Sequence, residues 1–157
     1  MKNNNIENIK LVKIDPKAYI ASDYVKENSG ESFSEILTRY ILEFQKNYKA
    51  NQREISDATG IQTALISKYK YGYRKPTLND VILLSLAMRL TPERSKYLLY
   101  AAGYVLNDQT EHRIYKLFLE GCAFNEEYSI ENCNKFLLKQ GYPMLSNCNL
   151  KKIDRFV

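Results

Sequence analysis

The sequence NQREISDATGIQTALISKYKYG, residues 51–72, indicates the fold more clearly than any other part of the chain. Asn51, with a glutamate three residues later, is typical of a helix start, and Gly60 can take the positive φ of a helix end. The segment therefore predicts a short helix from Gln52, a tight turn at Gly60 and a second, more exposed helix over 62–69. Two helices joined by a short glycine-containing turn form the shape that places a helix in the major groove of DNA.

Three more helices are predicted around this pair. Ser32 begins a capping box, and the apolar residues after it repeat with helical spacing, which predicts a helix over 33–48. Thr77 is the expected cap of a second helix. Thr91, followed by a proline and an acid, is a start signal for a third helix, which closes at Gly103. Five short helices in succession describe a compact all-α domain. The side chains expected to face inward include Phe33, Ile36, Leu37, Tyr40, Ile41, Ile55, Ala58, Ile61, Ile66, Tyr69, Val81, Ile82, Leu84, Met88, Leu98, Leu99 and Ala102.

Two flanking segments lie outside this domain, which we place at residues 32–104. Residues 1–31 are expected to form a short helix that docks on the domain or on a partner chain. Residues 105–157 predict two helices, one over about 111–121 and one between Ser129 and Gly141, with apolar residues that include Leu117, Phe136 and Leu138. Two helices of this size cannot bury their apolar faces alone, so they must pack on the first domain or on a second subunit.

The basic residues of the chain are concentrated around the quoted segment. The net charge is +5, from 23 lysines and arginines against 18 acids. Residues 1–31 and 105–157 are each balanced, whereas residues 32–104 carry eleven basic and six acidic side chains. Between 46 and 76 there are seven basic side chains and two acids. A concentrated basic surface is what a polyphosphate partner requires, although a solvated lysine-rich surface is the simpler explanation without a DNA-binding motif beneath it.

Other features of the composition narrow the class of protein. The three cysteines, Cys122, Cys133 and Cys148, have no close pair, so we expect them to pack as small hydrophobic side chains in a reducing cytoplasm. His112 is the only histidine, and we expect no metal site. No stretch approaches the roughly 18 apolar residues of a membrane span. No glycine-rich phosphate loop or nucleophile motif points to an enzyme or a cofactor, so we expect a cytoplasmic protein without catalytic activity.

A family resemblance covers residues 33–104. It rests on the pattern Gln52-x-Glu54-Ile55-Ser56-x-x-Thr59-Gly60-Ile61, followed by Ile66-Ser67-x-Tyr69-x-x-Gly72-x-Arg74-x-Pro76. This pattern is similar to that of the Xre/Cro–phage repressor family of helix-turn-helix proteins. The resemblance implies a five-helix DNA-binding domain from bacteria, phages or mobile elements, usually acting as a dimer on an inverted repeat. The chain departs from the family at Ser56, where alanine is frequent, and at Lys70, where glutamate is frequent.

In the resembled family, the outer side of the second motif helix faces base edges. Gln62 can offer its amide bidentately to adenine, and Lys68 can reach guanine or phosphate. Gln52 opens the first motif helix, where free backbone amides favour phosphate, and its side chain can bond that phosphate or Gln62. The loop after the second helix is expected to contact phosphates, which positions the protein without discriminating sequence. The alternative is a set of merely exposed polar residues. The expected DNA-binding residues are Gln52, Gln62, Thr63, Ala64, Ser67, Lys68, Tyr71, Arg74 and Lys75.

The sequence thus predicts a five-helix repressor-like domain with a short N-terminal segment and a C-terminal two-helix extension. The expected function is sequence-specific regulation of transcription, in the manner of a repressor, by a homodimer bound to double-stranded DNA. A DNA-contacting helix poor in arginine and asparagine discriminates only weakly between base sequences. A symmetric pair of domains doubles the number of base contacts that discriminate. The alternative is an antitoxin or inhibitor that holds another protein through its flanking helices, residues 105–157 above all.

Overall fold

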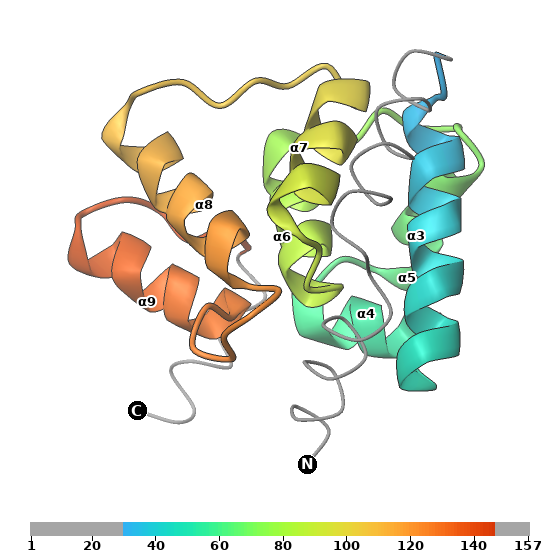
Figure 1. Ribbon diagram of the computed structural model, residues 1–157, viewed down its shortest axis with the longest axis horizontal. Helices are drawn as coiled ribbons and strands as arrows, with labels where there is room; N and C mark the ends of the chain where they lie inside the picture. The colour runs from blue at the N-terminus through green and yellow to red at the C-terminus, as the bar shows by residue number, and fades with distance from the viewer. Residues whose placement is uncertain (1–29, 147–157) are drawn as a thin grey trace.

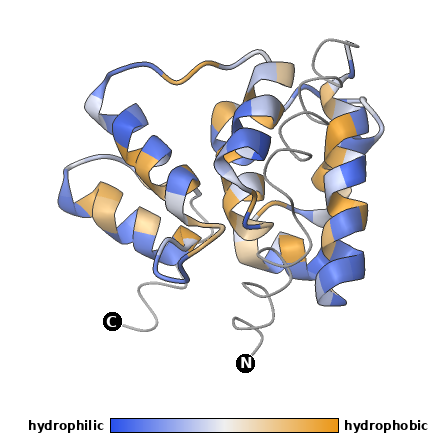
Figure 2. Cartoon of the chain, viewed as in Figure 1, coloured by the Kyte–Doolittle hydropathy of each residue, from blue (hydrophilic) through white to orange (hydrophobic). Residues whose placement is uncertain are grey.

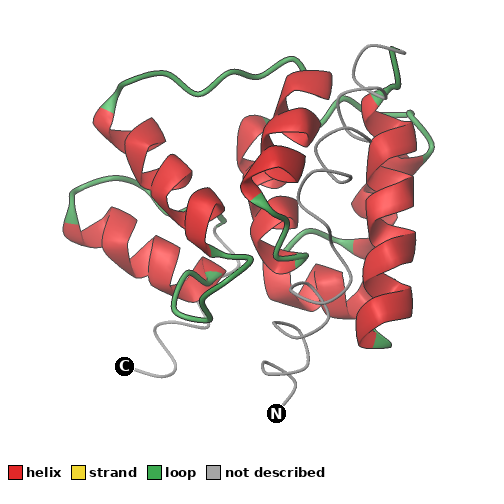
Figure 3. Ribbon diagram, in the orientation of Figure 1, coloured by secondary structure: helices red, strands yellow, loops and turns green. Residues whose placement is uncertain are grey.

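The computed structural model describes residues 30–146, and this part of the chain is all-α. It contains seven helices and no strand within the described residues (Figure 3). The helix expected within residues 1–29 and the packing expected of Cys148 lie outside the described residues. Within the described residues, no helix combines the length and the apolar character needed to span a bilayer.

The helices begin and end close to the predicted positions. They are α3 (Phe33–Tyr48), α4 (Gln52–Thr59), α5 (Thr63–Lys70), α6 (Leu78–Ala87), α7 (Pro92–Ala101), α8 (Thr110–Gly121) and α9 (Ile130–Lys139). The side chains of Ser32, Asn51, Thr77, Thr91 and Ser129 each accept a hydrogen bond from the amide three residues further on, as helix caps do. The predicted bounds of α5 were wrong by one residue, because Gln62 is the N-cap residue and not the first residue of the helix.

The central helix of the described structure is α6. α4, α7, α8 and α9 pack against it, and α3 packs on α5 and α7 (Figure 1). Residues 81–86 are all buried, and Figure 2 shows the concentration of hydrophobic residues along this helix. The sequence pattern identified Val81, Ile82 and Leu84 but missed Leu83 and Leu86, because helical periodicity marks one face and α6 is covered on all sides.

Most of the predicted core residues of α3 to α7 are buried, but Phe44 and Leu78, which the apolar spacing also marked, are only half-buried, and one predicted position in α4 is not buried at all. Ala58 is exposed, and its neighbour Thr59 is fully buried in its place. The helical phase that buries Ile55 at the start of this turn places residue 59, four positions later, on the same side. The prediction chose alanine over threonine on hydrophobicity, whereas the geometry of the helix decides which residue faces inward.

The two C-terminal helices pack on the rest of the described structure. α8 contacts α6 and α7, and α9 contacts α6 and α8, so one continuous core cluster includes side chains from all of them. Cys122 and Cys133 are fully buried in this cluster and are not joined in a disulfide, which agrees with the prediction that they pack as small hydrophobic side chains. Leu117, Phe136 and Leu138, which the sequence marked as apolar positions, are instead 44%, 39% and 45% exposed.

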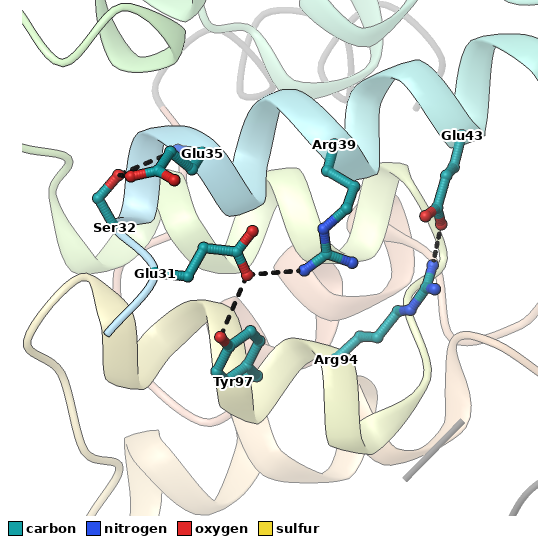
Figure 4. A network of polar contacts seen from close by, with 7 residues as sticks. All are labelled: Glu31, Ser32, Glu35, Arg39, Glu43, Arg94 and Tyr97. Carbon is teal, nitrogen blue, oxygen red and sulfur yellow. Dashed lines mark hydrogen bonds and ion pairs between the residues drawn. The ribbon is translucent and has the colours of Figure 1, made fainter. Parts of the chain in front are cut away.

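A group of polar contacts, which we call the polar clamp, joins α3 to α7. Glu31 accepts hydrogen bonds from Arg39 over 3.0 Å and from Tyr97 over 3.2 Å, and Arg94 forms an ion pair with Glu43 (Figure 4). Burial lowers the pKa of Arg94 to about 10, which leaves the guanidinium charged at neutral pH. The clamp holds α3 against the side of the structure opposite α8 and α9.

Candidate nucleic-acid interface

The turn between α4 and α5 is fixed by the hydroxyl of Thr59. Its Oγ1 donates to the carbonyl of Ile55 over 2.8 Å and accepts from the amide of Ile61 over 3.1 Å. Gly60 follows with a φ of 77°, a conformation that residues with a Cβ adopt only with strain. The hydroxyl of Ser56 also donates to the carbonyl of Ile61. These contacts set the angle at which α5 leaves α4.

The inner side of α5 is anchored to α3 and α6. Ile66 and Tyr69 are buried, and the ring of Tyr69 meets that of Phe33 edge to face with centroids 6.4 Å apart. The Tyr69 hydroxyl donates to the carboxylate of Asp80 in α6, and burial followed by this hydrogen bond raises the pKa of the phenol. Thr38 in α3 donates to the carbonyl of Lys70 over 3.3 Å. The buried contacts leave the opposite side of α5 open to solvent.

The side chains expected to contact bases are on that open side. Gln62, Thr63, Ala64 and Lys68 are exposed, and Ser67 is half-buried. Although Gln62 is the N-cap residue of α5, its side chain makes no capping hydrogen bond, so its amide is not committed to the helix. The sequence therefore identified the exposed side of α5 correctly. The contact of these side chains with DNA remains a prediction.

The side chain of Gln52 is committed to α5. Its Nε2 donates to the carbonyl of Thr63 over 3.1 Å and to Ser67 Oγ over 2.9 Å, and its Oε1 accepts from Lys70 Nζ over 3.1 Å. The sequence allowed a bond to Gln62 or to a phosphate. The partners are instead Thr63, Ser67 and Lys70, which leaves neither amide proton for a phosphate. Lys70, one of the two positions at which the sequence departs from the family pattern, is thus linked to Thr63 and Ser67 of α5 through Gln52.

The loop after α5 carries exposed aromatic and basic side chains. Tyr71 and Tyr73 are 68% and 80% exposed, with ring centroids 6.0 Å apart, and Arg74 is also exposed. Lys75 is exposed as well, but its ammonium lies 5.8 Å from the centroid of the Tyr104 ring, so it also packs against the end of α7. Tyr73 was not among the DNA-binding residues predicted from the sequence. Its position between basic residues is the sequence feature that could have led to its inclusion.

The structure separates three arginines from the other basic residues of 32–104. Arg39 and Arg94 belong to the polar clamp, and Arg89 donates to the carbonyls of Cys122 and Asn125 over 3.1 and 3.3 Å. These three arginines serve packing between helices. Within residues 30–146, Lys68 and Arg74 take part in none of the ion pairs of the structure. The charge available for a polyphosphate is therefore more concentrated around α5 than the sequence count alone implies.

No protein-family model, no curated protein and no solved structure matches the chain. The class that the fold defines is an all-α protein in which a short, well-anchored pair of helices presents a polar and basic outer side.

Proposed function

We propose that this protein is a sequence-specific DNA-binding regulator of transcription. In this proposal α3 to α7 form a five-helix helix-turn-helix domain of the Xre/Cro–phage repressor type, and α5 is the helix that enters the major groove. The observation that carries the proposal is the contrast between the two sides of α5: Ile66 and Tyr69 are buried, while Gln62, Ala64 and Lys68 are exposed. An anchored helix with an uncommitted polar side is suited to contact with base edges.

The charge distribution supports the same proposal. Lys68 and Arg74 lie on α5 and in the loop that follows it, and neither belongs to an ion pair among the described residues. Lysine and arginine side chains near the groove neutralise phosphates and release counterions, which provides most of the non-specific affinity. We propose repression as the output, because a protein bound across a promoter excludes polymerase. We also propose a homodimer on an inverted repeat, since α5 offers few bidentate contacts by itself.

The test is binding of the full chain to the DNA upstream of its own coding sequence at several salt concentrations. The affinity should fall steeply with salt, with a slope of roughly 0.9 for each phosphate contacted. Arg74→Ala should weaken binding to every duplex alike and reduce that slope by about one contact. Lys139→Ala removes the same charge from an exposed position on α9 and is the matched control. A wild-type affinity that does not respond to salt is incompatible with the proposal.

A second candidate function follows from the exposed apolar side chains near the C-terminal end of the described chain. Leu117, Phe124 and Leu138 are 44%, 52% and 45% exposed on and beside α8 and α9. An antitoxin or inhibitor would use such side chains to hold a protein partner, with or without DNA binding. Leu117→Ser combined with Phe124→Ser should then abolish capture of a partner encoded by a neighbouring gene while leaving DNA affinity unchanged. Equal capture by wild type and variant would remove this candidate.

A further inference from the structure

The three partners of the Gln52 side chain determine which way its amide faces. Lys70 Nζ lies 3.1 Å from Oε1, and an ammonium group can only donate. The carbonyl of Thr63 lies 3.1 Å from Nε2, and a carbonyl can only accept. A rotated amide would place two donors together at Lys70 and two acceptors together at Thr63. Only one orientation of the amide therefore satisfies both neighbours.

This orientation in turn determines the role of the Ser67 hydroxyl. Gln52 Nε2 carries two protons, of which one is directed to Thr63 and the other to Ser67 Oγ over 2.9 Å. The Ser67 oxygen must therefore act as the acceptor in that bond. Its own proton remains, and within residues 30–146 no hydrogen bond uses it. Because Ser67 is half-buried on the open side of α5, this proton is available to a group in front of the helix.

We propose that Lys70 and Gln52 are positioning residues that make Ser67 a hydrogen-bond donor toward a base. The inference rests on the proposed function, in which this side of α5 faces the major groove. In the major groove guanine (N7 and O6) and thymine (O4) present only acceptors to a hydroxyl donor, adenine presents one acceptor (N7) and one donor, and cytosine presents only an amino donor. The protein should therefore prefer guanine or thymine over cytosine opposite Ser67, by on the order of five-fold for one hydrogen bond.

The experiment is selection of duplexes from a random pool by the full chain and four variants, followed by affinity measurements on single-base variants of the best site. Ser67→Ala identifies the base pair opposite residue 67 as the position at which the preference disappears. Lys70→Met removes the donor that fixes the orientation of the Gln52 amide. It should weaken the base preference at the base pair opposite residue 67 and at no other position. Lys70→Arg keeps a donor there and should retain it. Gln52→Glu is the decisive variant, because a carboxylate cannot donate a hydrogen bond. The Ser67 hydroxyl must then donate its proton to residue 52 and present only its oxygen lone pairs to the DNA.

The predicted result for Gln52→Glu is a change of preference from guanine or thymine to cytosine at the position that Ser67→Ala identifies. A uniform loss of affinity from the added negative charge does not affect this readout, which compares bases within one variant. The proposal is overturned if Lys70→Met and Gln52→Glu both keep the wild-type preference there, or if Ser67→Ala changes no position. Failure of the wild type to enrich any duplex would instead contradict the proposed function, and this inference with it. Circular dichroism and thermal melting of each variant establish that all five proteins are folded.

Discussion

At the scale of single residues, Thr59 has a fully buried side chain whose hydroxyl makes two hydrogen bonds across the α4–α5 turn. Thr59→Val keeps the volume of the side chain but leaves the amide of Ile61 without its buried partner. We expect the free energy of unfolding to fall by about 1–3 kcal/mol, measured by urea denaturation. Thr110→Val, at an exposed helix start, is the control and should change stability by less than about 0.5 kcal/mol. Equal effects of the two substitutions would contradict the role given to Thr59.

Two groups, the buried Cys133 and the half-buried Tyr48, predict how stability depends on pH. Burial raises the pKa of Cys133 from 9.0 to about 12 and that of Tyr48 from 10.0 to about 12. In the unfolded chain both groups lose their protons at lower pH than in the folded chain. The stabilisation is therefore complete below pH 9 and is lost as pH rises toward 12, at up to about 1.4 kcal/mol per pH unit for each group.

Urea unfolding at intervals between pH 8 and pH 11.5 measures this loss. Cys133→Ala should make the decline shallower above pH 9, whatever its effect on stability at neutral pH. Tyr100→Phe removes a tyrosine that is 62% exposed and should leave the decline as it is in the wild type. A decline as steep in the Cys133→Ala variant as in the wild type would contradict the contribution given to the buried Cys133 thiol.

Sequence pattern alone located most of these residues but not all of their roles. The apolar positions of α4 and α5 follow from spacing, and the exposed side of α5 follows from the same spacing. The burial of Thr59 in place of Ala58 was missed because the prediction weighed hydrophobicity above position in the helix. The three partners of Gln52 could not be predicted, because they depend on where α5 crosses α4, which is set by contacts with α3 and α6 that are distant in the sequence.

At the scale of helices, the packing of α8 against the loop that leads into α9 depends on a glycine. A Cβ added at Gly121 would lie 2.2–2.7 Å from ring atoms of Tyr128, whose ring also meets that of Phe118 with centroids 5.4 Å apart. Gly121→Ala should therefore displace Tyr128 and lower the free energy of unfolding by about 1–3 kcal/mol, measured by thermal or urea denaturation.

The double variant Gly121→Ala with Tyr128→Ala distinguishes this clash from a backbone effect. Removal of the ring should recover part of the loss, so the two substitutions should be less than additive. Gly141→Ala is the matched control, because no atom lies within 4 Å of its added Cβ and the strain comes from a φ of +85°. If Tyr128→Ala also restored the free energy of unfolding of the Gly141→Ala variant, the proposed clash between residue 121 and Tyr128 would be contradicted.

The helix bounds were the most predictable part of the structure. Serine, threonine and asparagine caps produce a local signal, which is why the starts of α3, α4, α6, α7 and α9 agree with the prediction. α5 has no capping hydrogen bond from a side chain, and it is the motif helix whose start was misplaced. The burial of every residue from 81 to 86 of α6 was not predictable either, because it results from the packing of α8 and α9 on a helix already covered by α4 and α7.

At the scale of the whole molecule, the core does not stop at the boundary drawn from the sequence at residues 104 and 105. Buried residues of α6 and α7 belong to the same cluster as Ile114, Phe118 and Cys133. We therefore expect residues 30–146 to unfold in a single cooperative transition. Hydrogen exchange in increasing urea should give the same opening free energy for the core amides of α6 and of α8. Separate transitions for the two groups of helices would contradict this expectation.

The central claim is that the outer side of α5 discriminates DNA sequence, and selection of duplexes from a random pool by the full chain tests it most directly. We predict enrichment of an inverted repeat whose half-sites have centres about 10 base pairs apart. Gln62→Ala and Lys68→Ala should each change the preferred base within the half-site, while Lys139→Ala should return the wild-type site. Enrichment of no sequence by the wild type, or an identical site for Gln62→Ala, Lys68→Ala and wild type, would contradict the claim.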